Sequence, residues 1–314
     1  MVEQNAQQTP QGTAVIAPEQ GIEWTHAEFH ERCRSLVTGL TELGYKQGDK
    51  MVSDMPNTVE NLVLQVACSH IGVAVSTMKS STEEEVLKGF EALAEKAGGA
   101  PVGAVVSSID TPLSAVAETC DIDIITAQTE LAGPVLFDAL LHRTPSDDAP
   151  ASLSPDSPHA FFGGTKALTV AEVASLGSDA AYNLGIQAND KVCISITLMH
   201  SFGIASAVGG CASAGAAIVL PAVGGIRGCG VPSQRAEVTR SVLSSTQASL
   251  LFGDFHTLRA LPEPGGLDLS ALRGGVIKCG SGTDFMDQAE ATVGGHTLTL
   301  EYAGVSFKMM GKKP

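Results

Sequence analysis

The stretch KMVSDMPNTVENLVLQVACSHIGVAVST (residues 50–77) decides the fold class of this chain. Residues 51–53 form a short strand that Pro56 and Asn57 end, and residues 59–70 place apolar side chains at helical spacing. Residues 73–76 follow as an almost wholly apolar run, which is typical of a strand buried on both faces of a sheet. A strand, a helix and a buried strand in this order predict a parallel β-α-β unit.

The same alternation extends to both sides of this unit. Before it, Thr25 and Glu28 form a capping box that begins a helix, and Gly44 occupies a position at which helices commonly end. After it, Thr82 caps a helix whose first turn is acidic, as the helix dipole favours. The other elements predicted in this half are strands at 13–17, 102–106 and 122–125 and a helix at 112–119. This spacing predicts a doubly wound, parallel α/β sheet.

A proline-rich segment divides the chain. Residues 142–158 hold four prolines among serines and aspartates, a composition typical of a linker or surface loop. The pattern then resumes, with helices at 169–184 and 203–214 and strands at 160–162, 191–196, 217–220, 248–252, 275–277 and 297–300. We therefore predict two doubly wound α/β subdomains, residues 1–150 with the linker at 142–158, and residues 159–314.

Charge and composition exclude several classes of partner. The formal net charge of −15 repels phosphate backbones and anionic lipid headgroups, and aromatic residues, at 4%, are too few for base-stacking surfaces. We therefore predict neither nucleic-acid binding nor membrane-surface binding, and we expect Lys308, Lys312 and Lys313 to form a solvated basic tail. No apolar run reaches the roughly 18 residues that a membrane helix needs, so no membrane span is predicted.

The cysteines and the first residues bear on location. Seven cysteines without a Cys-x-x-Cys motif predict reduced core thiols in an intracellular protein, and neither a zinc site nor a disulfide framework. The first 20 residues contain no lysine or arginine and no long apolar run. We therefore expect no secretory signal and no Arg-rich presequence at this end.

Short motifs follow one another in a fixed order along residues 13–305. They are WTHAE (24–28), LGYKQGDK (43–50), LGIQANDKV (184–192), LMHSFG (198–203), GAAIVLP (215–221), LRGGVIKCG (272–280) and EYAG (301–304). Together they resemble the adenylate-forming acyl-CoA synthetases, or AMP-binding enzymes. The resemblance implies the two stacked α/β subdomains of that family's N-terminal domain. The family's barrel and C-terminal lid would lie beyond Pro314 and are expected to be lacking.

That family activates a carboxylic acid with ATP to an acyl-adenylate, and many members then transfer the acyl group to CoA. The chemistry requires a glycine-rich phosphate loop, a carboxylate that holds Mg²⁺ and a lysine of the lid. The phosphate loop corresponds to FFGGTKA (161–167) here, which is shorter and lacks the family's serine and proline. A shorter loop offers fewer N–H donors, so we favour a glycine turn between a strand and a helix over a vestigial phosphate contact.

The magnesium site of the family corresponds to YAGVS (302–306) in this chain. Ser306, or its neighbour if the motif is shifted by one residue, offers no carboxylate where the family carries a Thr-Glu pair. We therefore expect no catalytic residue, no metal site and no cofactor.

Several residues correspond to binding positions of the family. His200 resembles the histidine that lines the acyl pocket, although a packed histidine without such a role is the alternative, and Ser281 stands where relatives contact adenine. The vestigial binding residues that we predict are Gly163, Gly164, Thr165, Lys166, His200, Gly280 and Tyr302.

These expectations favour a catalytically inactive, acyl-CoA synthetase-like protein that serves as a structural or accessory subunit of a larger assembly. Its partners would be other protein subunits, because a domain that normally packs against a barrel exposes apolar surface there. A mitochondrial location is favoured over a cytoplasmic one, because acyl-activating enzymes are common in mitochondria. Two alternatives stay open: a vestigial module that binds a nucleotide or acyl-CoA weakly, and an acyl-activating ligase completed by another chain.

Overall fold

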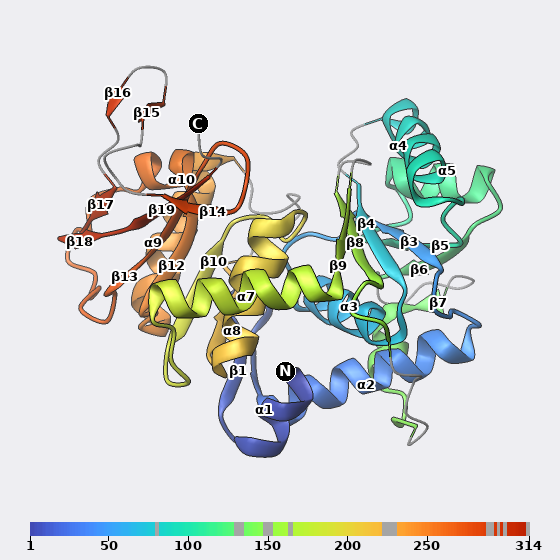
Figure 1. Cartoon of the computed structure of the whole chain (residues 1–314), viewed down its shortest axis with the longest axis horizontal. Coiled ribbons are helices and arrows are strands. Elements are labelled where there is room, and N and C mark those ends of the chain that lie inside the picture. Colours follow the sequence, from blue (N-terminus) through green and yellow to red (C-terminus); the bar gives the residue numbers. More distant parts are fainter. Residues whose placement is uncertain are drawn as a thin grey trace. The chain divides into compact units, whose positions relative to one another are not determined.

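The computed structural model describes residues 1–78, 82–128, 135–146, 153–162, 166–221, 231–286, 292–293, 296–297 and 300–311. The chain forms two compact units (Figure 1). The discontinuous unit comprises Met1–Ala27 and Ala174–Pro314, and the continuous unit comprises Glu28–Val173. Each unit contains helices and a mainly parallel sheet, so the predicted α/β class is confirmed.

The continuous unit is built on a sheet whose described strands run in the order β7-β6-β5-β3-β4-β8-β9. Its strands are β3 (Lys50–Ser53), β4 (Ala74–Thr77), β5 (Gly103–Val106), β6 (Asp123–Thr126), β7 (Val135–Leu136), β8 (Pro158–Phe162) and β9 (Lys166–Thr169). Its helices are α2 (His26–Glu42), α3 (Val59–Ile71), α4 (Glu83–Ala97), α5 (Pro112–Thr119) and α6 (Phe137–Leu141). Neighbouring strands are parallel except β8 and β9, which are antiparallel. The β-α-β unit predicted over residues 50–77 is present as β3, α3 and β4.

Local capping explains where the helices of this unit begin. The Thr82 hydroxyl accepts the backbone N–H of Glu85 at 3.3 Å, which confirms the predicted cap of α4. The turn from β3 to α3 is held by Asn61, whose buried amide donates to the carbonyl oxygens of Met55 at 3.1 Å and Pro56 at 2.9 Å. This buried amide therefore replaces backbone hydrogen bonds that the break at Pro56 leaves unmade.

His159 on β8 is a buried histidine whose two ring nitrogens have no hydrogen-bond partner among the described residues. Burial lowers its pKa to about 4, because a charged imidazolium there would lose its hydration without compensation. The neutral ring is therefore favoured in the folded chain. Its contribution to stability is fully present above the ordinary pKa of about 6.5 and declines as the pH falls from there towards 4.

We expect His159→Leu to flatten the pH dependence of stability between pH 7 and pH 5. The wild-type chain should lose about 2 kcal/mol of its free energy of unfolding over this interval through His159, whereas the leucine variant has no such group to protonate. Urea unfolding at both pH values measures the difference. His142→Leu, which removes an exposed histidine, is the control and should keep the wild-type slope. Parallel curves for wild type and His159→Leu would contradict the prediction.

The discontinuous unit has a sheet whose described strands run in the order β14-β19-β13-β12-β10-β11-β1-β2. They are β1 (Thr13–Ala17), β2 (Ile22–Thr25), β10 (Lys191–Ser195), β11 (Ala217–Val219), β12 (Leu250–Asp254), β13 (Gly274–Cys279), β14 (Asp284–Met286) and β19 (Lys308–Gly311). The helices are α1 (Val2–Gln8), α7 (Val170–Leu184), α8 (Gly209–Ala214), α9 (Pro232–Thr246) and α10 (Phe255–Ala260), with α7 beginning before the boundary. Only β2 and β14 run antiparallel to their neighbours among these strands. Two short hairpins, β15–β16 and β17–β18, stand outside this sheet (Figure 1).

The unit boundaries differ from the boundary placed within 142–158 on the sequence. Residues 158–169 stay with the continuous unit because β8 pairs with β4. The first 27 residues join the C-terminal half because β1 pairs in parallel with β11, with Val15 opposite Ile218. Figure 1 shows this N-terminal strand in blue, joined to the sheet of the yellow and red elements. Pairing between strands about 200 residues apart leaves no local signal in the sequence.

Two predicted elements of the second half are corrected by the structure. The helix expected at 203–214 begins as a buried π-helix, Phe202–Val208, and continues as α8. A solvated tail was expected from Lys308 onward, but residues 308–311 form β19, which pairs with β13 and buries Met309 and Met310. Of the strand expected at 297–300, Thr297 belongs to β16, and residues 298–299 lie outside the described residues. The Lys308 side chain is exposed, and Lys312 and Lys313 lie outside the described residues. A four-residue strand beside a basic terminus has too little alternation to be recognised.

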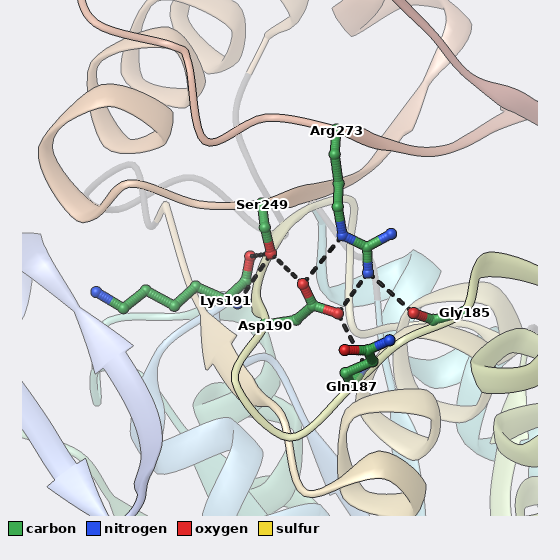
Figure 2. Close-up of polar contacts among 6 residues, drawn as sticks. All are labelled: Gly185, Gln187, Asp190, Lys191, Ser249 and Arg273. Atoms are coloured by element: carbon green, nitrogen blue, oxygen red, sulfur yellow. Dashed lines mark hydrogen bonds and ion pairs between the residues drawn. The ribbon is translucent and has the colours of Figure 1, made fainter.

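Asp190 joins the amino-terminal ends of β10, β12 and β13 (Figure 2). Its buried carboxylate accepts two hydrogen bonds from Arg273, at 3.2 and 2.5 Å, one from the Ser249 hydroxyl at 2.7 Å and one from the Gln187 backbone at 2.8 Å. Arg273 also donates to the carbonyl oxygen of Gly185 at 2.9 Å. Burial alone would raise the pKa of Asp190, but the hydrogen bonds from Arg273, Ser249 and Gln187 outweigh it and hold that pKa below its ordinary value.

Two further sequence expectations concern the cysteines and the membrane. Cys33, Cys68, Cys193 and Cys211 are buried free thiols, as predicted, whereas Cys120 is exposed and Cys279 is half-buried. Among the residues that the structure describes, no helix is both long and apolar enough to cross a membrane.

Candidate functional site

The strand order of the discontinuous unit creates a switch point between β10 and β12. The chain leaves β10 for β11 on one side of it, and returns through α9 to β12 on the other side. In open parallel sheets, ligands bind outside the carboxyl ends of the strands at such a point, because the two connections diverge and leave a crevice. The topology therefore directs attention to the residues that follow β10, β12 and β13.

A cavity of about 470 Å³ lies at this position. It is lined by Ile196, His200, Ser201, Asp254, Phe255, His256, Lys278, Cys279, Gly280, Ser281 and Gly282. These residues follow or end the three strands β10, β12 and β13. The volume is within the range of small-molecule sites, and the lining combines apolar side chains with a few polar groups, as such sites usually do.

His200 enters the cavity from the segment between β10 and the π-helix. Its ring stacks on Phe202, with centroids 6.4 Å apart and 23° between the planes, and Phe202 in turn packs on Phe252 of β12. Burial lowers the pKa of His200, and the positive charge of Lys278 lowers it further. A neutral imidazole is therefore favoured at neutral pH and can exchange hydrogen bonds with a ligand.

Lys278 lies on β13, at the edge of the cavity. Its ammonium stands over the Phe202 ring, 5.9 Å from the centroid, and donates a hydrogen bond to the carbonyl oxygen of Gly282. Burial lowers the pKa of Lys278 to about 8, although the charges of Cys279 and Asp284 act in the opposite direction. The site thus holds a cation that loses its proton more readily than an ordinary lysine.

The loop after β13 exposes backbone to the cavity. Gly280 and Gly282 have φ values of 76° and 85°, in the left-handed region that favours glycine, and Ser281 between them is exposed. Gly280 has open space where a Cβ would stand, so only the backbone conformation requires glycine there. The loop therefore lets a ligand approach closely at this point.

Asp254 also lines the cavity, and its carboxylate is held by several hydrogen bonds. Its carboxylate caps α10 by accepting the Thr257 N–H at 2.6 Å, and pairs with Arg235 of α9 at 2.7 Å. Arg235 also donates to the Thr257 hydroxyl at 2.5 Å. Because these contacts already use the carboxylate, Asp254 mainly positions α10 and the cavity wall.

Tyr302 does not line this cavity. It belongs to the hairpin of β17 (Glu301–Tyr302) and β18 (Val305–Ser306), whose turn residues Ala303 and Gly304 both have positive φ. Its hydroxyl donates to the carbonyl oxygen of Pro262 at 2.8 Å, and its ring packs on the core. Ser306 pairs with Glu301 across the hairpin and donates to its carboxylate at 3.3 Å.

The predicted phosphate-loop residues belong to the continuous unit. Gly163, Gly164 and Thr165 lie outside the described residues. The backbone of Lys166 begins β9 and pairs with Phe162 of β8. The segment therefore connects two antiparallel strands, whereas the sequence suggested a strand followed directly by a helix.

The structure thus brings His200 and Gly280 of the predicted set to one cavity, together with Ser281. Sequence reasoning missed Lys278 and Asp254, although each stands at the carboxyl end of a predicted strand, where parallel strands converge. Within the described residues, no three His, Cys, Asp or Glu side chains gather closely enough to hold a metal ion.

Comparison with known sequences supports the motif order. A family model described as AMP-binding enzyme matches residues 2–95. YngI of Bacillus subtilis, whose name assigns it provisionally to the acyl-CoA synthetases, is 25% identical over 251 residues, covering 70% of this chain and 46% of YngI. Acetyl-coenzyme A synthetase of Ralstonia pickettii is 37% identical over 81 residues, which is 26% of this chain and 11% of that protein. The chain therefore spans less than half the length of these relatives.

Comparison with solved structures supports the fold. MbtA of Mycobacterium smegmatis superposes with a TM-score of 0.72 at 17% identity, over 88% of this chain and 51% of MbtA. The N-terminal domain of FACL13 of Mycobacterium tuberculosis superposes with a TM-score of 0.68 at 18% identity, over 92% of this chain and 70% of that domain. The chain therefore resembles AMP-binding enzymes and acyl-CoA synthetases in sequence, and it has the fold of the N-terminal domain of the adenylate-forming enzymes.

Proposed function

We propose that this chain is a non-catalytic relative of the acyl-CoA synthetases that binds an adenine nucleotide or an acyl-CoA in the cavity at the ends of β10, β12 and β13. The observation that carries the proposal is the composition of this cavity, with one lysine, one neutral histidine and a glycine-flanked serine around about 470 Å³. A phosphate or carboxylate would find a positive charge at Lys278, and an aromatic or apolar group would find Ile196 and Phe255.

The absence of turnover is proposed from the hairpin that ends at Ser306. The resemblance assigns magnesium binding to this region, yet its final residue is a neutral serine. The hairpin does contain one carboxylate, that of Glu301, but it accepts a hydrogen bond from the Ser306 hydroxyl and does not line the cavity. The carboxylate that does line the cavity, Asp254, already pairs with Arg235 and accepts the Thr257 N–H. We therefore propose that the charge that develops during adenylation is not neutralised here.

Titration calorimetry with AMP, ATP and acetyl-CoA tests this function. We expect saturable binding that is unchanged when EDTA replaces Mg²⁺, together with no ATP–pyrophosphate exchange in the presence of carboxylic acids. Binding of none of the three ligands at millimolar concentration would refute the binding proposal. Pyrophosphate exchange by the purified chain would refute the proposal that it is inactive.

We expect Ser281→Tyr to weaken nucleotide or acyl-CoA binding at least tenfold, because the larger side chain fills the cavity at an exposed position without disturbing the core. The same calorimetric titration measures the loss. Ser178→Tyr, at an exposed position of α7, is the matched control and should bind like the wild type. Equal affinities for the two variants would exclude this cavity as the binding site.

We also propose that the chain acts as an accessory subunit of a larger assembly in mitochondria. Tyr182 of α7 is 88% exposed, and aromatic side chains are enriched in protein interfaces. If α7 docks on a partner, Tyr182→Ala should release the chain from its complex on native gels of mitochondrial extract, whereas Leu267→Ala should not. Migration of the wild-type chain as a free monomer in such extracts would refute this role.

A further inference from the structure

Lys278 combines partial burial, a position in the cavity lining and the absence of a direct ion pair among the described residues. The Lys278 side chain lines the cavity with its amine over the Phe202 ring, and the amine donates a hydrogen bond to a neutral carbonyl oxygen, that of Gly282. Among the described residues, no carboxylate forms an ion pair with it. An ammonium group that is desolvated without a paired anion is destabilised relative to the neutral amine.

The titratable neighbours of Lys278 do not reverse this effect. The charges of Cys279 on the same strand and Asp284 on β14 raise the pKa of Lys278, yet burial outweighs both and sets it at about 8. His200, which lines the same cavity, has a lowered pKa, so its neutral form is favoured at neutral pH. A substantial fraction of neutral amine is consequently present at pH 8, whereas an ordinary lysine, with a pKa of about 10.4, is almost wholly protonated.

We propose that Lys278 is a nucleophilic lysine that accepts an acyl group from an acyl thioester bound in this cavity. The inference rests on the cavity of the proposed function, and it adds a covalent step at one residue. Ile196 and Phe255 supply apolar surface for the acyl chain, and the hydroxyls of Ser201 and Ser281 can donate to the carbonyl oxygen of a thioester beside the amine.

The step balances without a further reactant. The neutral Lys278 nitrogen attacks the thioester carbonyl carbon, so that an N–C bond forms and the C–S bond breaks. The thiolate leaves with the electron pair of the C–S bond and takes up the proton that the nitrogen releases. The products are an amide on Lys278 and a free thiol.

Two other lysines of the chain provide internal controls. Lys88 is exposed and pairs with Glu84 at 2.6 Å. Lys191 is partly buried, but its amine donates to the Thr246 carbonyl oxygen at 3.0 Å and does not line the cavity. Neither position combines desolvation with a neighbouring binding site.

The test is residue-resolved acetylation of the full chain with acetyl-CoA at pH 8, followed by peptide mass spectrometry. At this pH about half of the Lys278 side chains carry a neutral amine, compared with well under 1% of an ordinary lysine. A less basic amine is also a weaker nucleophile, which offsets part of this difference in reaction rate. We expect Lys278 to react at least tenfold faster than Lys88 and Lys191. Its rate should saturate with acetyl-CoA and rise with a midpoint near pH 8.

The wild-type measurement decides the inference without any variant, and Lys278→Arg adds a check. The arginine keeps the charge but carries no reactive amine, so it should abolish this acetylation at an unchanged melting temperature. Equal rates at the three lysines would overturn the inference. If calorimetry shows acetyl-CoA binding while Lys278 stays unmodified, the acylation of Lys278 is refuted and the proposed ligand binding is supported. If neither binding nor acetylation occurs, both the ligand binding and the acylation of Lys278 are refuted.

Discussion

Replacing Gly203 by alanine is expected to lower the free energy of unfolding by about 3 kcal/mol, the upper part of the range for overpacked cores. Gly203 is buried in the π-helix, where a Cβ would stand 2.0 Å from the carbonyl oxygen of Thr197 and 3.1 Å from the Cα of Leu198. Both contacts are backbone atoms, so no side-chain rotation relieves them. The gain in helix propensity from glycine to alanine, at most about 1 kcal/mol, cannot offset such a clash.

The same substitution should also weaken ligand binding. Residues 197–201 carry the chain from β10 to the cavity, and His200 lies among them. Any shift of this segment that accommodates a Cβ at position 203 also displaces His200 from the cavity wall. Calorimetry on the folded fraction should therefore show reduced affinity in addition to the lower stability.

Gly210→Ala is the matched control for this prediction. Gly210 is buried in α8, but a Cβ there would first meet side-chain atoms, Ile186 Cδ1 at 3.3 Å and Ala180 Cβ at 3.5 Å. We expect its stability to stay within about 1 kcal/mol of the wild type, because the Ile186 side chain can adjust. Urea unfolding of both variants measures the difference. A Gly203→Ala protein as stable as Gly210→Ala would contradict the packing around the π-helix.

Replacing Arg273 by methionine is the second change for which a large loss is expected. The variant leaves the buried Asp190 carboxylate with hydrogen bonds from Ser249 and the Gln187 backbone but without its cation (Figure 2). Removing one partner of a buried ion pair commonly costs 3–5 kcal/mol. Because the Arg273 side chain is 44% exposed, we expect about 3 kcal/mol.

The loss should depend on pH in a defined direction. Arg273 holds the pKa of Asp190 below 3.8, so the pair stabilises the folded chain above that value and ceases to do so as the pH falls through the folded pKa. The variant and the wild type should therefore converge in stability under strongly acidic conditions. Lys88→Met removes an exposed pair with Glu84 and should cost under 1 kcal/mol at any pH. Similar losses for the two variants at pH 7 would refute a stabilising role for the Asp190 pair.

Much of the secondary structure follows from local sequence. The cap at Thr82, the β-α-β unit at 50–77 and the helix at 112–119 were predicted from local features, and the structure reproduces them. The π-helix was not predictable, because small residues such as Gly203 and Ala205 leave no periodic signal that separates it from an α-helix. The partner strand at 308–311 was missed because it is short and lacks alternation.

The candidate site was predictable only in part. His200 and Gly280 follow from the resemblance, and both line the cavity. Lys278 gives no signal of its own in the sequence, since its unusual amine arises from burial beside Phe202, which lies 76 positions earlier in the chain. Tyr302 looked like part of the same site, but its hairpin directs the hydroxyl to Pro262.

The sequence by itself determined the α/β class, most helix and strand positions and the family resemblance, because capping, periodicity and motif order depend on residues close together in the chain. Only the tertiary structure decided that the first strand belongs with the last half of the chain, that β10 and β12 flank a switch point, and that Lys278 faces a cavity there. The physical reason is that strand pairing and desolvation depend on neighbours in space, and those neighbours are up to about 200 residues away in sequence.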